Sequence, residues 1–208
     1  MSEKNDTLSS TEIRKVLNVG GNDKAIPIPP CFDGWQHDLL DIDPQGNPDV
    51  LCDARELWRL PPRQYDAIYC SHNLEHYHRH EVINVLKGFK IVLKKDGFIF
   101  VRVPDLDAVM RRVVEKGLDI DDVLYEAACG PILVRDVIYG YHVKIERSGN
   151  DFFAHKTGFT KKSLLNVLRD NGFTSISTWC GNLEVAALAF INQPEKIRSD
   201  ALVESLQY

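Results

Sequence analysis

The chain has no long hydrophobic run, no paired-cysteine motif and no excess of basic side chains. Its most continuous apolar stretch, Val185 to Ile191, is too short to span a bilayer, and residues 1 to 12 are polar. We therefore expect neither a signal peptide nor insertion into a membrane. The odd number of cysteines and the lack of CxxC argue against a disulfide framework or a cysteine zinc site, and favour a reducing, cytoplasmic location. The cysteines are Cys31, Cys52, Cys70, Cys129 and Cys180.

Charge and composition narrow the class further. The 208 residues carry 25 basic and 30 acidic side chains, a net charge of -5. This balance provides no basic field for a phosphate backbone, so we expect no nucleic-acid partner. Hydrophobic residues (44%) and charged residues (26%) are close to average globular usage, which argues against a disordered or coiled-coil chain. Against a typical domain length of about 150 residues, the length favours a single domain.

Short apolar runs alternate with helical patterns along most of the chain. Lys15 to Val19 predicts a first strand, and the prolines at 27, 29 and 30 argue against a long helix after it. Apolar residues at helical spacing predict a helix over 81–93, and Thr160 is placed to cap another over 161–171. Further strands are predicted over 36–42, 49–52, 65–70, 97–103, 175–179 and 184–191, the last two close enough for a hairpin.

This alternation predicts an α/β fold with a Rossmann-like open seven-stranded sheet, mostly parallel, with a C-terminal antiparallel hairpin and helices on both faces. We expect one domain over 1–192 and a peripheral tail over 193–208. Within the domain we expect a lid or insertion over about 105–160, with helices at 106–116 and 121–128. Ligands of such sheets bind beyond the carboxyl ends of the strands, which places the candidate site at Gly20, Asp41, Asp53 and Ser71.

The residues at this edge indicate a nucleoside ligand. Gly20 lets a ligand approach the backbone closely, and Asp41, about twenty residues further on, can accept hydrogen bonds from two ribose hydroxyls. A dinucleotide would also need a helix that opens from the glycine turn and receives its pyrophosphate. The three prolines and the lack of a GxGxxG string argue against that second class.

Five segments in order resemble the class I S-adenosylmethionine-dependent methyltransferases, in particular their small-molecule, methyltransferase type 11-like group. They are LNVGG at 17–21, LDIDP at 40–44, DA at 53–54, YCSHNLEH at 69–76 and VLKKDG at 92–97, and the likeness resumes over 159–191. The resemblance implies S-adenosylmethionine as cofactor and a small-molecule acceptor, such as a sugar or glycan precursor. It also implies cofactor contacts, with Gly20 and Gly21 at the methionine part, Asp41 and Ile42 at the ribose and adenine, Asp53 and Ala54 at the adenine edge, and Ser71 and His72 on the inner side.

Two positions depart from that family. It usually has an acidic residue where Asn18 stands, beside the methionine amino group, and a second glycine where Asn22 stands. These departures leave open an alternative, a methyltransferase-fold module that serves binding or assembly without catalysis. The lack of an Asn/Asp-Pro-Pro-Tyr string at 70–73 counts against methylation of base amino groups.

Histidines cluster after the fourth predicted strand, and His72 to His76 matches the HxxEH pattern of inverted zinc proteases. On a helix, His72 and His76 would share a face and Glu75 could act as general base. That site needs a third ligand and a long surrounding helix, whereas this string directly follows a strand. We therefore keep a zinc hydrolase only as a remote alternative, and expect no metal site.

An aromatic and imidazole-rich group in the lid would either wall an acceptor pocket or pack on the sheet edge. If the acceptor is a hydroxyl or an amine, His155 or His142 is the candidate for taking its proton, because imidazole titrates near neutral pH. The resemblance also places His76 near the cofactor or acceptor, while a structural bond with Glu75 is the alternative. The group comprises Tyr139, Tyr141, His142, Phe152, Phe153 and His155.

Overall fold

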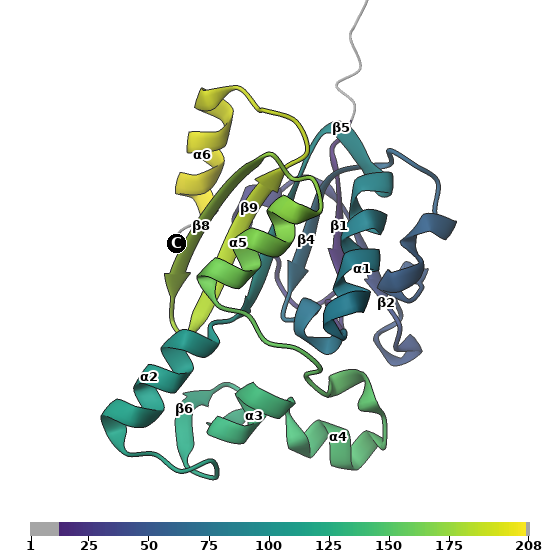
Figure 1. Cartoon of the computed structure of the whole chain (residues 1–208). Coiled ribbons are helices and arrows are strands. Elements are labelled where there is room, and N and C mark those ends of the chain that lie inside the picture. Colours follow the sequence, from purple (N-terminus) through teal and green to yellow (C-terminus); the bar gives the residue numbers. More distant parts are fainter. Residues whose placement is uncertain (1–12, 207–208) are drawn as a thin grey trace, which may run out of the picture.

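A seven-stranded sheet forms the centre of the molecule in the computed structural model, which describes residues 13–206, apart from the side chains of 196–198 (Figure 1). The strand order is β3-β2-β1-β4-β5-β9-β8. The first five strands are parallel, and β9 pairs antiparallel with both β5 and β8. This confirms the predicted mostly parallel sheet with its C-terminal hairpin. The strands are β1 Lys15–Val19, β2 Gln36–Asp41, β3 Val50–Leu51, β4 Tyr65–Ser71, β5 Leu93–Pro104, β8 Ser175–Gly181 and β9 Glu184–Phe190.

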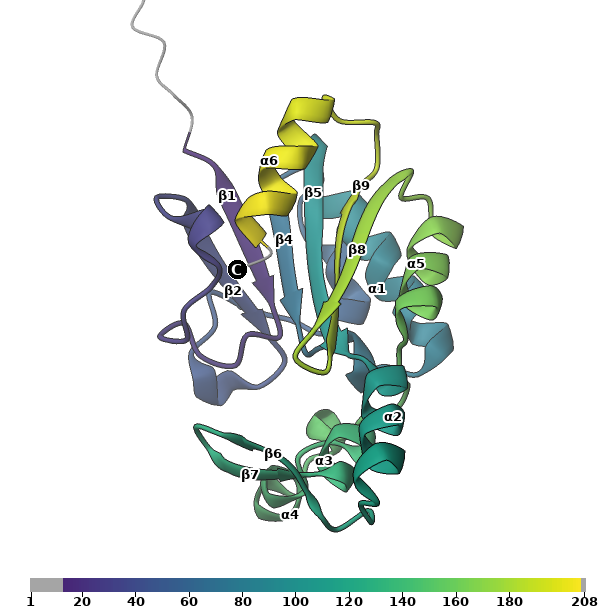
Figure 2. The same ribbon diagram turned by 90° about the vertical axis from the view of Figure 1, so that its left-hand side faces the viewer.

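The strand order reverses between β1 and β4, which are hydrogen-bonded neighbours although β2 and β3 intervene in sequence. The carboxyl ends of β1, β2 and β4 therefore lie at the same end of the sheet, which is its lower end in Figures 1 and 2. Ligands of open α/β sheets bind at such a point. The topology therefore brings the turns after these three strands together.

One face of the sheet is covered by α1 (Arg79–Val92), α5 (Lys161–Asp170) and the 3-10 segment η3 (Ala54–Arg59) (Figure 1). The apolar stripe of α1, which includes Val85, Leu86 and Phe89, is fully buried, as its helical spacing predicts. At the start of α5, the Thr160 hydroxyl accepts a hydrogen bond from the Ser163 amide at 3.3 Å, which confirms the predicted cap. These elements form the larger hydrophobic core with the inward side chains of the strands.

The opposite face has a different cover. Between β1 and β2 the chain forms one 3-10 turn, η1 (Pro30–Phe32), so the absence of a long helix there is confirmed. Figure 2 shows α6 (Lys196–Leu206) lying across this face, away from α1 and α5. Leu206 is buried there among Phe98, Phe100 and Leu188. The described part of the tail, expected to be peripheral, therefore packs on the sheet and helps η1 to bury the aromatic side chains of this face.

Residues 105–160, here called the insertion, form a small unit beyond the carboxyl ends of the strands (Figure 1). The helix expected at 121–128 is wrong, because Val123–Ala127 forms a strand that pairs antiparallel with Gly130–Leu133. At its start Leu124 is buried between the exposed Val123 and Tyr125, as expected where successive side chains of a strand point to opposite faces. The insertion consists of α2 Leu106–Lys116, β6 Val123–Ala127, β7 Gly130–Leu133, α3 Val134–Tyr139, α4 His142–Ser148 and the 3-10 turn η5 Asp151–Phe153.

The insertion has its own hydrophobic core, built from Val109, Leu124, Ile132, Val134 and Val137. It is also tied to the rest of the chain, since the Asp105 amide donates to the Leu183 carbonyl at 2.8 Å and the Lys156 amide donates to the Glu75 carbonyl at 2.7 Å. Across residues 13–206, none of the helices combines the length and the apolar character needed to cross a bilayer.

Candidate functional site

The turn after β1 packs directly against the turn after β4. Gly20 has a φ of +72°, and its amide donates to the Leu40 carbonyl at 2.8 Å. A Cβ at Gly20 would lie 2.1 Å from the side-chain nitrogen of Asn73, so only glycine fits at this contact. The backbone of Gly20 and the amide of Asn73 are thereby brought side by side in the wall of one pocket.

Asn22, one of the two departures from the family pattern, has a left-handed φ of 63°. Glycine adopts this conformation freely, and asparagine is among the side chains that tolerate it best. The Asn22 amide donates to Oδ2 of Asp41 at 2.9 Å, which ties the first turn to the end of β2. The substitution is therefore compatible with the shape of the turn.

Asp41 is nearly buried at the end of β2. Its second oxygen, Oδ1, accepts a hydrogen bond from the Asp43 amide at 2.9 Å. A carboxylate oxygen has two acceptor positions, so one on each oxygen remains for a ligand. Asp41 lines a cavity of about 190 Å³, here called the turn pocket, whose walls are Gly20, Asn22, Asp41, Ile42, Asp43, His72, Asn73, His76, Lys144, Phe152 and Phe153.

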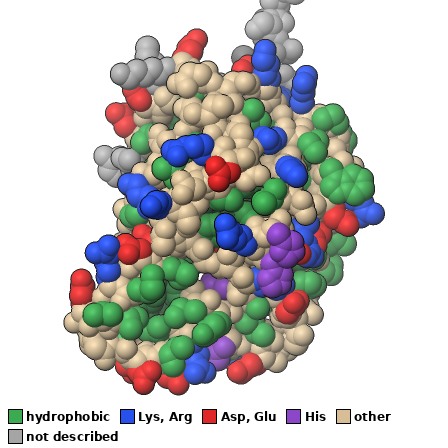
Figure 3. All heavy atoms as spheres, viewed as in Figure 1, with side chains coloured by type: hydrophobic (Ala, Val, Ile, Leu, Met, Phe, Trp, Pro, Cys, Tyr) green, Lys and Arg blue, Asp and Glu red, His purple; other side chains and the backbone are tan. Residues whose placement is uncertain are grey.

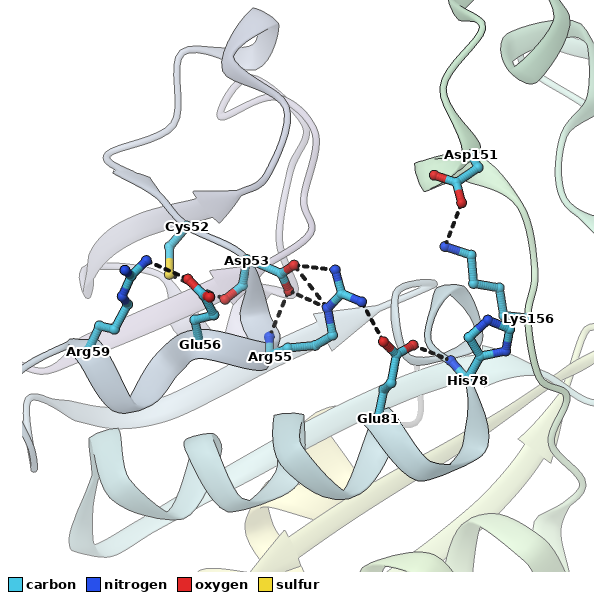
Figure 4. Close-up of polar contacts among 9 residues, drawn as sticks. All are labelled: Cys52, Asp53, Arg55, Glu56, Arg59, His78, Glu81, Asp151 and Lys156. Carbon is cyan, nitrogen blue, oxygen red and sulfur yellow. Dashed lines mark hydrogen bonds and ion pairs between the residues drawn. The ribbon is translucent and has the colours of Figure 1, made fainter.

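A second hollow, of about 350 Å³, adjoins the turn pocket, since Ile42 lines both. Asp53 lies in its wall, but its carboxylate is paired with Arg55, which also contacts Glu81 at 2.5 Å (Figure 4). Ala54 is buried in the large core, so its methyl group faces away from solvent. The two neighbouring predicted residues thus contribute differently: Asp53 shapes the hollow, while Ala54 packs beneath it.

Three other predicted residues support the pocket without lining it. Asn18 is buried beneath the first turn, and a Cβ at Gly21 would meet its side-chain nitrogen at 2.2 Å. Gly21 therefore permits the close packing of Asn18. Ser71 ends β4 opposite Arg102 of β5, and neither Asn18, Gly21 nor Ser71 is among the lining residues of the turn pocket.

His72 lies between the turn pocket and a larger cavity under the insertion, and lines both. Its ring nitrogen Nε2 contacts Glu184 Oε1 at 2.6 Å, and Nδ1 is 3.5 Å from Glu75. Burial alone would lower the pKa of His72, but these two carboxylates raise it to about 9. Glu184 also pairs with Arg102, so charged groups from β4, β5 and β9 form one network.

The larger cavity, here called the insertion pocket, has a volume of about 540 Å³ and is closed on one side by the insertion. Figure 3 shows histidine side chains in and beside the furrow between the insertion and the rest of the molecule. Its walls combine arginine, tyrosine, histidine and carboxylate side chains with a few apolar ones. They are His72, Arg102, Pro104, Arg112, Tyr125, Ile132, Asp136, Val137, Tyr141, His155, Asn182, Leu183 and Glu184.

His155 and His142, the two candidate bases, have different surroundings. His155 lines the insertion pocket, and its Nδ1 lies 2.9 Å from the Val137 carbonyl. This contact assigns the proton to Nδ1 and leaves Nε2 unprotonated in the neutral ring, and burial lowers the pKa of His155 despite the nearby Glu75 carboxylate. His142 instead bonds Asp136 at 2.5 Å and lines a separate hollow of the insertion. The structure does not bring His142 to either pocket.

The HxxEH string does not form the helix that a zinc protease needs. Leu74–His76 is a single 3-10 turn, η4, and His72 has a left-handed φ of 50°. Glu75 is fully buried, and His76 lines the turn pocket with its ring nitrogens near the carbonyls of Ala154 and His72. His76 therefore lies at the turn pocket, in a 3-10 turn and not in the helix of a zinc protease.

Several lining residues are absent from the predicted set, among them Asn73, Arg102, Lys144 and Glu184. Asn73 belongs to the same string as His72 and directly follows β4, so its position after a strand could have identified it. Glu184 lies 112 residues from its partner His72, and only the pairing of β5 with β9 brings them together. The aromatic residues of the insertion divide, since Tyr141 lines the insertion pocket whereas Phe152 and Phe153 line the turn pocket.

Comparison with solved structures identifies the fold. A protein of Pyrococcus horikoshii superposes with a TM-score of 0.57 at 16% identity, covering 88% of this chain and 84% of that one. A SAM dependent methyltransferase of Archaeoglobus fulgidus gives 0.50 at 15% identity, covering 86% of both. The 1,6-didemethyltoxoflavin-N1-methyltransferase of Burkholderia thailandensis, solved with 1,6-didemethyltoxoflavin and S-adenosylhomocysteine, gives 0.51 at 15%, covering 85% of this chain and 70% of that one.

No protein-family model matches the chain, and no curated protein matches its sequence. The likeness is thus one of structure, and at these identities it establishes the fold alone. The chain has the fold of the class I S-adenosylmethionine-dependent methyltransferases, as the sequence predicts.

Proposed function

We propose that this protein transfers a methyl group from S-adenosylmethionine to a small-molecule acceptor. The observation that carries the proposal is the juxtaposition of Gly20, Asp41 and Asn73 in one pocket at the switch point of a methyltransferase-type sheet. The turn pocket and the insertion pocket share His72, so two ligands bound in them would be neighbours.

The residues of the turn pocket suit the nucleoside part of this cofactor. The free acceptor positions of Asp41 fit ribose hydroxyls, and Ile42, which also lines the adjoining hollow, offers an apolar side to adenine. Asn73 adds a side-chain amide beside Gly20, where the methionine part would lie. When bound, S-adenosylmethionine supplies an electrophilic methyl group on a positively charged sulfur.

The insertion pocket suits a polar acceptor, such as a sugar or a glycan precursor. Arg102, Glu184 and Asp136 provide donors and acceptors, while Tyr125 and Tyr141 offer flat apolar surfaces that also end in hydroxyls. Arg112 adds a half-buried guanidinium with no ion pair to any residue in 13–206. This combination matches hydroxyl-rich compounds better than purely apolar ones.

Methyl transfer requires mainly a fixed in-line approach in a site that excludes water. The insertion provides the cover, since Lys144, Phe152 and Phe153 lie over the turn pocket. His155 is the group suited to take a proton from the acceptor, because its Nε2 is unprotonated in the neutral ring. His72 keeps its proton at neutral pH, since its pKa is about 9, and therefore serves as a positive charge in the wall.

Calorimetric titration with S-adenosylmethionine and S-adenosylhomocysteine tests the proposal. We expect both to bind the intact chain, and Asp41→Ala to weaken both by about tenfold or more, because hydrogen bonds to a charged group contribute about 1.5–3 kcal/mol. Asp170→Ala, at an exposed position at the end of α5, is the control and should bind normally. Unchanged affinity in Asp41→Ala would remove the assignment.

A second candidate, a methyltransferase-fold binding module without turnover, is favoured by one observation. Both oxygens of Asp41 already accept backbone amides, and Lys144 of the insertion bonds Asn22 beside them. A pocket tied in this way could hold the fold together without binding a cofactor. The same titration separates the two, since this module predicts no binding of either compound, or binding without methyl transfer to any hydroxylated acceptor.

A further inference from the structure

Three side chains, those of Glu75, His76 and His155, lie close together between the turn pocket and the insertion pocket. Glu75, His76 and His155 each offer one ligand atom, and these atoms lie within 4.8 Å of one another. Glu75 and His76 come from the turn after β4, whereas His155 comes from the returning end of the insertion. His76 lines the turn pocket and His155 lines the insertion pocket, so the cluster forms part of the wall between them.

Glu75 is the unusual member of this cluster. Its side chain is 1% exposed, and neither of its carboxylate oxygens has a hydrogen-bond partner within residues 13–206. A buried carboxylate without partners is costly, and such groups are normally hydrogen-bonded, paired or bound to a metal. Its ion-pair partner is His72, whose Nδ1 lies 3.5 Å away and lowers the pKa of Glu75, but this separation leaves both carboxylate oxygens without a hydrogen bond of good geometry.

Hydrogen-bond contacts hold the imidazole rings of His155 and His76 in place. His155 donates Nδ1–H to the Val137 carbonyl at 2.9 Å, which leaves the lone pair of Nε2 available. Metal-bound histidines characteristically use one nitrogen in this way to fix the ring. His76 has Nδ1 3.2 Å from the Ala154 carbonyl and Nε2 3.1 Å from the His72 carbonyl. A neutral ring can donate to only one of the two carbonyls, so its other nitrogen lacks a suitable partner.

The backbone around the cluster is fixed by hydrogen bonds between the two segments. The amides of Lys156 and Thr157 both donate to the Glu75 carbonyl, at 2.7 and 3.2 Å. The His155 amide donates to the Tyr139 carbonyl at 3.0 Å, within the insertion. The backbone positions of the three residues are therefore set before any ligand arrives, so that only side-chain rotations are needed to complete a binding site.

We propose that Glu75, His76 and His155 bind a divalent transition-metal ion of the zinc class, with its remaining coordination positions facing the two pockets. Two imidazoles and one carboxylate form a known ligand set for catalytic Zn²⁺ and for non-haem Fe²⁺. Ligand atoms about 2.0–2.2 Å from a zinc ion lie about 3–4 Å apart, so modest side-chain rotations close the cluster.

This site differs from the zinc-protease site that the HxxEH string alone would suggest. That hypothesis takes His72 and His76 as ligands on one helix, whereas the His72 ring lies between the carboxylates of Glu184 and Glu75 and no helix forms. The cluster instead combines two residues of the string, Glu75 and His76, with His155, which lies 79 positions after His76 in the sequence. Sequence spacing alone could not have combined them.

The metal site also has a consequence for the proposed methyl transfer, and this consequence rests on the proposed function. A hydroxyl of the acceptor bound to the metal would have a lowered pKa and would release its proton to solvent water near neutral pH, before the methyl group is transferred to the resulting alkoxide. His155 would then act as a metal ligand instead of a free base. The substrate class favoured by this arrangement is a hydroxyl-bearing acceptor that reaches the metal from the insertion pocket.

Metal content after equilibrium dialysis against zinc chloride tests the site, with cobalt chloride as a spectroscopic probe. We expect one zinc ion per chain, and visible cobalt absorption bands typical of nitrogen and oxygen ligation. His155→Gln and Glu75→Gln should each lower zinc affinity by at least about tenfold, since even changes around a ligand cost that much. Glu75→Gln also removes the buried charge, so it should fold without metal. His80→Gln is the control, because His80 is exposed at the start of α1 and stacks only on His78.

Two results would overturn the proposal: no bound metal in the intact chain, or binding that persists in His155→Gln and Glu75→Gln. The first would favour the rival account, in which the ion pair with His72 is the only partner that Glu75 needs among residues 13–206. Calorimetry with S-adenosylhomocysteine on metal-free protein keeps this outcome separate from the proposed function. Cofactor binding without zinc binding removes the metal site alone, and zinc binding without cofactor binding removes the methyltransferase assignment alone.

Discussion

Lys144 in α4 donates a hydrogen bond to the side-chain oxygen of Asn22 at 2.6 Å, across 122 positions of sequence. The same ammonium group lies 3.9 Å from the centre of the Phe153 ring. One lysine therefore connects the insertion to the turn after β1 and also orders the aromatic residue over the turn pocket. Asn22, which departs from the family pattern, is the acceptor of this contact, and the glycine found there in the family has no side chain to replace it.

Lys144→Met should therefore loosen the cover of the turn pocket. The hydrogen bond and the cation–π contact together contribute about 1–2 kcal/mol, so we expect S-adenosylhomocysteine to dissociate roughly fivefold to thirtyfold faster. Stopped-flow measurement of cofactor release gives the rate directly. Lys162→Met, on the exposed side of α5, is the control, and equal rates in both variants would show that Lys144 does not hold the cover.

Gly20→Ala should destabilise the fold through two separate effects. The φ of +72° costs an L residue about 1–2 kcal/mol, and the new Cβ would lie 2.1 Å from the Asn73 side chain. Gly117→Ala is a matched control, because Gly117 has a similar φ of +62° and no atom within 4 Å of its added Cβ. We expect thermal melts to show a larger loss in Gly20→Ala, and Asn73→Ala in the same chain to recover the difference. Equal melting temperatures for the two single variants would contradict the contact.

The sheet and the outline of the site could be predicted from sequence because they depend on local signals. The apolar run at 15–19, the prolines at 27 to 30 and the stripe of the helix over 81–93 each act over a few residues, and each is found in the structure. The turns after β1, β2 and β4 are adjacent in any sheet of this topology. Their residues could therefore be placed together before the contacts were known.

The parts that were not predicted depend on distant pairing. Val123 to Ala127 has helix-compatible residues, and its partner strand and the turn at Gly130 decide that it is a strand. The tail over 193–208 is mostly polar in sequence, yet Leu206 is buried in the hydrophobic cluster on one face of the sheet. The Glu184–His72 pair and the Glu75–His76–His155 cluster join segments from β9, β4 and the insertion, and no spacing rule links them.

Leu206→Ala should lower the stability of the whole chain although it lies near the end of the described residues. The side chain packs against Phe98, Phe100 and Leu188, and truncating a buried leucine costs about 2–5 kcal/mol. We expect a lower midpoint in urea unfolding followed by tryptophan fluorescence, since Trp179 packs at the same face. Glu204→Ala, exposed on the same helix, is the control. If both variants unfold at the same urea concentration, α6 does not contribute to the core.

The Asp136 carboxylate should make the stability of the insertion depend on acid. It is 3% exposed and accepts hydrogen bonds from the Leu133 amide at 2.8 Å and from the amide and ring of His142. Burial would raise its pKa, but these donors hold the pKa of Asp136 below the ordinary value of an aspartate carboxyl group. A carboxyl group with a depressed folded-state pKa stabilises the fold above its unfolded pKa, and this contribution is lost as the pH falls through the folded pKa.

Asp136→Asn should therefore lower the melting temperature at neutral pH, by an amount equivalent to about 1–3 kcal/mol. The difference from the unmodified chain should shrink as the pH falls from about 4, where the carboxylate of the unfolded chain becomes protonated, through the lower pKa of the folded state. Melts across the pH range, with limited proteolysis of residues 105–160, measure this directly. Asp121→Asn provides the comparison, because the Asp121–Arg135 pair belongs to the same insertion but its carboxylate is 64% exposed, and such pairs contribute little. A difference that stays constant down to pH values well below 4 would mean that Asp136 acts through its shape and not through its charge.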